Sequence, residues 1–166
     1  MNQRRWIALN FINPTKGLLD LDKMFDDIVE FIKDDKDSSY KLMIGTDSQP
    51  GKVICFVSAV IIYREGKGAR YYYRKFQHKK IPSLRQRIFM EANYSIELAN
   101  LLSAKFEKMG KTDFNIEIHL DVGENGMTKD IIKEVVGMVT GCGFDAQVKP
   151  DSYGASKVAD KYTKSM

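Results

Sequence analysis

Cysteine is scarce in this chain of 166 residues, which contains only two. Cys55 and Cys142 lie far apart and show no paired spacing. This pattern argues against a disulfide framework and against a zinc site. We expect Cys55 to be a buried strand residue.

Long apolar runs are also lacking. The longest, Val53 to Tyr63, is interrupted by Ser58 and is too short to span a bilayer. Only a brief apolar patch stands before Asn13-Pro14, so we expect no signal peptide. The sequence therefore predicts a cytoplasmic protein that has no membrane partner.

The chain length fits one domain that buries most of its apolar surface in a single core. Hydrophobic residues make up 43% and charged residues 29%, which is the balance of a globular protein rather than a disordered one. We predict a single domain over residues 1–166, in which residues 1–39 form an N-terminal extension with an amphipathic helix.

Acidic residues are absent between Gly66 and Ile88, although this segment is rich in lysine, arginine and tyrosine. Such clusters hold phosphate backbones, and the interleaved aromatic rings can stack on bases. The alternative is a solvated edge strand whose lysines oppose aggregation. The residues that we expect to bind nucleic acid are Arg70, Arg74, Lys75, Lys79 and Lys80.

Apolar spacing predicts secondary structure along the whole chain. The expected helices are Asp20–Lys33 with Asp20 as N-cap, Leu84–Met109, Thr128–Thr140 and Ala155–Lys164, and the expected strands are Tyr40–Asp47, Val53–Arg64, Ala69–Lys79, Phe114–Asp121 and Phe144–Lys149. The first three strands suggest an antiparallel meander, and the later order alternates strand and helix. We therefore predict an α/β fold with a five-stranded mixed sheet and helices on both faces.

Two acids follow predicted strands. Asp47 ends the first strand, within Ile44-Gly45-Thr46-Asp47-Ser48-Gln49, and Asp121 ends the fourth. If these strands are adjacent and parallel, the two carboxylates lie side by side at the carboxyl end of the sheet. The alternative for Asp121 is an ordinary turn aspartate.

Glu91 lies on the apolar face of the long helix, three residues after Ile88 and seven after Leu84. A carboxylate on an inward face is costly to bury unless it is paired or binds a metal. The structural alternative is a pairing with Arg87, one turn earlier.

The last helix carries Asp160, for which a surface ion pair is the alternative and Asp151 is a rival. Glu117 and His119 on the fourth strand are weaker candidates. Several carboxylates that repel one another need a compensating cation. Oxygen ligands suit hard divalent ions, so we expect Mg²⁺ or Mn²⁺ at such a cluster.

The chain resembles the ribonuclease H-like superfamily, and within it the YkuK-type family of predicted nucleases. The matching blocks are Ile44–Gln49, Arg87–Ala99 with Glu91, Leu120–Gly123 and Ala155–Lys161, within a resemblance from Leu21 to Lys164. The resemblance implies that four acids bind metal, namely Asp47, Glu91, Asp121 and Asp160.

The resemblance also implies hydrolysis of phosphodiester bonds in RNA, DNA or a hybrid by a two-metal mechanism. In that hypothesis Asp47 bridges two ions, Glu91 and Asp121 hold the ion at the leaving oxygen, and Asp160 holds the other. The main alternative is a catalytically inactive nucleic-acid-binding module of the same fold. A partner-binding domain and an ATP-binding relative of the actin-like branch are further alternatives.

Overall fold

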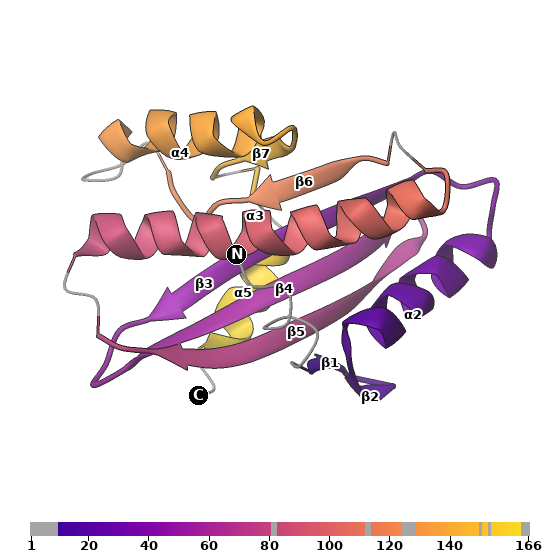
Figure 1. Cartoon of the computed structure of the whole chain (residues 1–166), viewed down its shortest axis with the longest axis horizontal. Helices are drawn as coiled ribbons and strands as arrows, with labels where there is room; N and C mark the ends of the chain where they lie inside the picture. The colour runs from indigo at the N-terminus through magenta and orange to yellow at the C-terminus, as the bar shows by residue number, and fades with distance from the viewer. Residues whose placement is uncertain are drawn as a thin grey trace.

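The computed structural model describes residues 10–80, 83–111, 114–123, 129–149, 151–152 and 154–163 (Figure 1). Within these residues the strands are β1 (Phe11–Asn13), β2 (Gly17–Leu19), β3 (Tyr40–Gln49), β4 (Ile54–Arg64), β5 (Gly68–His78), β6 (Ile116–His119) and β7 (Asp145–Gln147). The helices are α2 (Leu21–Lys33), α3 (Leu84–Lys108), α4 (Lys129–Gly141) and α5 (Ala155–Thr163). None of the described helices is long and apolar enough to cross a membrane.

The described strands form one seven-stranded sheet in the order β2-β1-β5-β4-β3-β6-β7. β3, β4 and β5 are paired antiparallel along nearly their full lengths, which confirms the expected meander. β6 lies parallel to β3, and β7 lies parallel to β6. The first and fourth predicted strands are therefore adjacent and parallel, and their carboxyl ends, which precede or carry Asp47 and Asp121, lie at the same edge of the sheet.

The expected number of strands, five, is wrong, because β1 and β2 extend the sheet at the β5 edge. They form a small antiparallel hairpin in which Ile12 pairs with Leu18. Each strand has only three residues, too few for an alternating apolar pattern to be recognised. The last two predicted strands are present but shorter than expected.

Helices cover both faces of the sheet, and in Figure 1 α3 crosses in front of it while α5 lies behind. Successive strand residues point to opposite faces. Thr46 on β3 therefore meets Ser95 of α3 at 2.8 Å between hydroxyl oxygens, whereas the α5 residue Ala159 packs with Val57 and Ala59 on the other face. This alternation decides which side chains can reach each helix.

The helix α2 begins as expected, since Asp20 accepts a 2.8 Å hydrogen bond from the Lys23 backbone N–H. It is joined to the sheet through Asp27, which is buried. The Tyr72 hydroxyl donates to Oδ2 of Asp27 at 2.5 Å, and Arg70 and Lys16 each lie 3.2 Å from Oδ1. Asp27 thus holds the N-terminal segment on β5.

Candidate functional site

The carboxyl end of β3 is where the candidate acids converge. Pairing with β6 ends at Gly45 and His119, whereas β3 continues alongside β4 to Gln49. The described residues place no strand beside Thr46–Gln49 on the β6 side. Side chains from both faces of the sheet can therefore approach one another around this edge.

Asp47 points to the face that α5 covers, and only 7% of the residue is exposed. Its Oδ2 accepts a 2.9 Å hydrogen bond from the Thr163 hydroxyl in the last turn of α5. Strand pleat and helix packing together fix the carboxylate at the end of β3. Asp47 is thus a buried acid whose carboxylate is held by a hydrogen bond.

Glu91 reaches the same edge from the other face. The Ser48 hydroxyl donates a 2.5 Å hydrogen bond to Oε2 of Glu91. Some of the residue stays exposed, yet the surroundings of the carboxyl group raise its pKa to about 8. Burial is the largest cause, and the charges of Asp47 and Asp121 raise the pKa further.

Two interactions oppose this rise, namely the Ser48 hydrogen bond and the charge of Arg87. The hydrogen-bond partner of Glu91 is therefore Ser48, while Arg87 acts on it only through its charge. The charges of Asp47 and Asp121 both act on the Glu91 carboxyl group.

Asp121 lies two residues beyond the end of β6, with 29% of its side chain exposed. The Lys149 ammonium nitrogen is 2.7 Å from Oδ1 of Asp121. The backbone N–H of Lys149 also donates to the Val122 carbonyl at 2.9 Å, so the segment after β7 is fixed beside Asp121. One of the three acids therefore already has a protein cation beside it.

The fourth predicted acid, Asp160, falls on α5, but its side chain lies outside the described residues. Its rival Asp151 is exposed in the turn after β7, where its backbone N–H donates to the Val148 carbonyl at 2.7 Å. The charges of Asp47 and Asp121 therefore act on Glu91 at this edge of the sheet, and the fourth position stays a prediction.

The donor chemistry of these three acids fits a hard divalent cation, because carboxylate oxygens are its preferred ligands and their mutual repulsion would be relieved by it. In the part of the chain that the structure describes, no three His, Cys, Asp or Glu side chains are close enough to enclose one ion. Binding would therefore require side-chain adjustment at this edge.

Glu117 and His119 belong to a separate polar chain on the α5 face. Lys41 lies 3.2 Å from Glu117, whose Oε1 is 3.1 Å from Nε2 of His119. The Gly154 backbone N–H donates to Nδ1 of His119 at 3.3 Å, which is the pattern of a neutral imidazole. Burial lowers the pKa of His119, which agrees with a neutral ring. The hydrogen bond from Gly154 links this polar chain to the start of α5.

The expected basic segment divides into supporting and exposed cations. Arg70 is ion-paired with Asp27, and Arg74 is only 4% exposed with its guanidinium 4.1 Å from the centre of the Phe76 ring. The prediction that Arg74 binds nucleic acid is therefore not supported, because its side chain is buried. The remaining expected residues, Lys75, Lys79 and Lys80, are exposed.

Lys75 has a defined relation to Asp47. Asp47 is paired with Val57, and Val57 is paired with Lys75, so all three point to the same face of the sheet. Two strand spacings separate the ends of this row, or about 10 Å. This is the one cation of the expected set that the register aligns with the acid.

Sequence reasoning missed three polar partners of the acids, Ser48, Thr163 and Lys149. Ser48 is adjacent to Asp47 and could have been noticed from the strand period, which puts it on the opposite face, toward Glu91. Thr163 and Lys149 gave no comparable signal, since only tertiary packing brings them to Asp47 and Asp121.

Comparison with known proteins agrees with this fold. A family model described as Ribonuclease H-like matches residues 23–164. The chain is 35% identical over 167 aligned positions to the uncharacterized protein YkuK of Bacillus subtilis (strain 168), with 93% of this chain and 96% of that protein covered. No solved structure matches with significant similarity.

The chain therefore belongs to the ribonuclease H-like class of proteins, and within that class to the family of YkuK. This confirms the resemblance seen in the sequence. Membership of the class indicates a nuclease-type or nucleic-acid-binding function in general terms.

Proposed function

We propose that the protein is a metal-dependent nuclease that hydrolyses phosphodiester bonds of RNA, DNA or a hybrid. The observation that carries the proposal is the position of Asp47 and Glu91 at one edge of the sheet, held by Thr163 and Ser48, where burial and the charges of Asp47 and Asp121 raise the pKa of Glu91. Clustered acids with strongly shifted pKa values are a mark of functional sites, because a stable fold gains nothing from their repulsion.

Asp47, Glu91 and Asp121 would hold the metal, and Mg²⁺ or Mn²⁺ suits their oxygen atoms. In nucleases of the two-metal type, bound ions activate water and offset the charge that develops on the attacked phosphate. The number of ions, expected to be two, and the part played by Asp160 belong to the same proposal.

The other residues of the site position these acids and the substrate. Thr163 holds Asp47 from α5, and Ser48 holds Glu91 from β3. Lys75, about 10 Å along the cross-strand row from Asp47, lies where it would grip a neighbouring phosphate without reading sequence. Lys79 and Lys80 would extend this contact along the backbone.

One observation favours the second candidate, a catalytically inactive nucleic-acid-binding module. Asp121 is already neutralised in part by Lys149 at 2.7 Å, as an acid retained for structure would be. In that case the exposed lysines would still bind nucleic acid, and the acids would have no role in turnover.

Incubation of the purified protein with labelled RNA, DNA and hybrid substrates in Mg²⁺ or Mn²⁺ separates the two candidates. The nuclease produces metal-dependent cleavage that EDTA stops. The binding module shows salt-sensitive affinity and no cleavage with either ion.

A further inference from the structure

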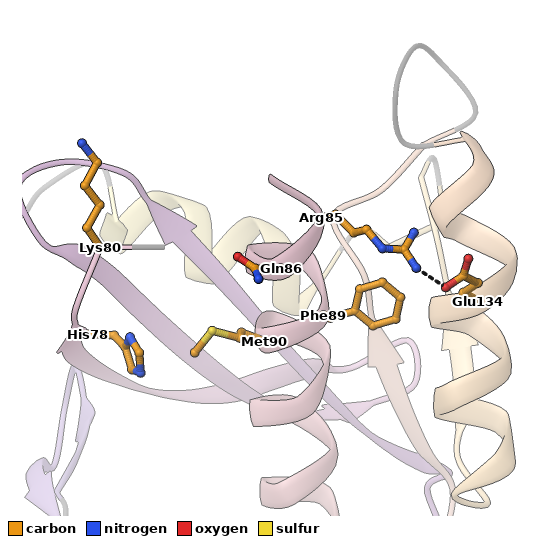
Figure 2. A pocket seen from close by; sticks show the side chains of 7 residues that line it. All are labelled: His78, Lys80, Arg85, Gln86, Phe89, Met90 and Glu134. Carbon is orange, nitrogen blue, oxygen red and sulfur yellow. Dashed lines mark hydrogen bonds and ion pairs between the residues drawn. The ribbon is translucent and has the colours of Figure 1, made fainter. Parts of the chain in front are cut away.

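A hollow of about 660 Å³ lies beside the first turns of α3, outside the acid cluster (Figure 2). Its lining comes from the end of β5, from α3 and from α4. The lining residues are His78, Lys80, Arg85, Gln86, Phe89, Met90 and Glu134. A volume of this size is in the range of small-ligand sites.

The floor of the hollow is apolar and partly aromatic. Phe89 and Met90 pack against the hydrophobic core but remain partly exposed. Figure 2 shows Met90 directed toward His78, and Phe89 directed toward Glu134 on α4. The partly exposed ring of Phe89 offers an apolar face on which a planar ring can stack.

Positive charge dominates the rim. Lys80 is exposed, and the Arg85 guanidinium lies 5.0 Å from the centre of the Phe89 ring. Among the described lining residues Glu134 is the only acid, and its Oε2 is 2.6 Å from Nη2 of Arg85. The exposed amide of Gln86 adds donors and an acceptor for a polar ring edge.

The position of the hollow relates it to the acids. Met90 directly precedes Glu91 on α3, and Gln86 lies about one turn before Met90. A nucleotide in the hollow would therefore have its neighbours in the strand within reach of the carboxylate cluster.

We propose that this hollow is a binding site for one unpaired nucleotide, whose base stacks on Phe89 while Arg85 holds its phosphate. The inference deepens the proposed nuclease function and depends on it for biological meaning. A base inside a duplex is already stacked and cannot enter without unpairing, so the site selects single-stranded or frayed nucleic acid.

Binding measured in EDTA tests this site without turnover. Fluorescence anisotropy would compare a labelled single-stranded 12-mer with the same strand in a duplex. The variant Phe89→Leu should weaken single-strand binding about fivefold or more, because base–aromatic stacking contributes at least about 1 kcal/mol per base. Duplex affinity should stay unchanged.

Two matched controls accompany this variant. Phe114→Leu removes a partly buried ring that stacks on Phe106 at the far end of α3, and should leave single-strand binding unchanged. Glu134→Gln removes the rim acid and should strengthen single-strand binding, whereas Glu107→Gln makes the same charge change at an exposed site outside the hollow and should not.

Gln86→Ala provides a second test at an exposed position, where loss of the side chain should not disturb the fold. It should also weaken single-strand binding. Ultraviolet crosslinking of a 5-iodouridine oligonucleotide should label the peptide that contains Phe89.

The proposal is overturned if Phe89→Leu and Gln86→Ala bind the single strand as the parent does, or if Phe89→Leu weakens duplex binding equally. It is also overturned if light scattering shows a dimer that Phe89→Leu dissociates, since the hollow would then be an interface between copies. Cleavage can fail while these binding differences persist, and so the two proposals are distinguishable.

Discussion

The Thr163 hydroxyl donates a 2.9 Å hydrogen bond to Oδ2 of Asp47, linking the last turn of α5 to the end of β3. Both residues are buried. The bond joins two positions that are 116 residues apart in the chain. The position of the proposed central acid thus depends on the docking of a helix at the other end of the sequence.

Replacement of Thr163 by valine should reduce both stability and cleavage. The variant loses a buried hydrogen bond to a charged group, which is worth about 1.5 to 3 kcal/mol. Thr163→Ser should restore most of the loss. Thr140→Val is the control, because the exposed Thr140 hydroxyl bonds only within its own helix at 2.9 Å to the Val136 carbonyl. Equal denaturation midpoints for Thr163→Val and Thr140→Val would contradict this account.

Stability without metal should fall as pH rises toward 8. Glu91 has a pKa of about 8 in the folded protein against an ordinary value of 4.5. The folded state therefore holds the proton more tightly, and its contribution to stability is complete below about pH 4.5 and lost as pH rises through 8.

Glu91→Gln should abolish this dependence. Each pKa unit corresponds to about 1.4 kcal/mol, so the parent should lose a few kcal/mol between pH 5 and 9 relative to the variant. Denaturant unfolding in EDTA across this range measures the difference, with Glu107→Gln as the exposed control on the same helix. Parallel curves for the parent and Glu91→Gln would show that Glu91 titrates normally.

The attachment of α2 should weaken at acid pH. Burial raises the pKa of Asp27, but hydrogen bonds from Tyr72 and Lys16 and the charge of Arg70 outweigh it and lower the pKa below 3.8. This contribution to stability is present above pH 3.8 and is lost as pH falls through the pKa in the folded protein.

Asp27→Asn should accordingly cost about 2 kcal/mol at neutral pH. Asp26→Asn, which changes an exposed residue on the same helix, should cost little. Calorimetric unfolding of both variants at pH 7 gives the comparison. Similar losses of stability would show that Asp27 stabilises the fold no more than the exposed Asp26 does.

The contribution of Lys75 to nucleic-acid affinity should be visible in the salt dependence of binding. Removing one phosphate contact lowers the slope of log affinity against log salt by about 0.7 to 0.9. Lys75→Gln should show this change, whereas Lys67→Gln should not, because the Lys67 ammonium group is ion-paired with Asp35 at 3.1 Å. Equal slopes for the two variants would remove Lys75 from the proposed interface.

The sequence predicted the central sheet because β3, β4 and β5 carry long β-branched and apolar stretches with clear turns between them. It missed β1 and β2, whose three-residue length carries no periodic signal. Their position depends on long-range contacts with the edge of β5, namely the pairing of Ile12 with Tyr73 and a 3.0 Å hydrogen bond from the Asn13 side-chain amide to the Tyr71 carbonyl.

At the site, the sequence could identify each acid by itself, because a carboxylate at the end of a buried strand or on the inward face of a helix is costly to bury. The sequence could not predict how the acids are held. Glu91 meets Ser48 only because α3 crosses β3 at that level, and Lys149 meets Asp121 because β7 lies parallel to β6. Basic residues were the least predictable, because Arg74 is buried while Lys75 beside it is exposed.

The most direct test of the carboxylate cluster is the cleavage rate of labelled RNA, DNA and hybrid by the parent, Asp47→Asn and Asp37→Asn in Mg²⁺ and Mn²⁺. Asp37 is exposed in the loop before β3 and provides the matched control. The account predicts metal-dependent cleavage that Asp47→Asn reduces by about a hundredfold or more and Asp37→Asn leaves intact. Absence of cleavage with all three substrates and both ions, or equal rates for the parent and Asp47→Asn, would contradict it.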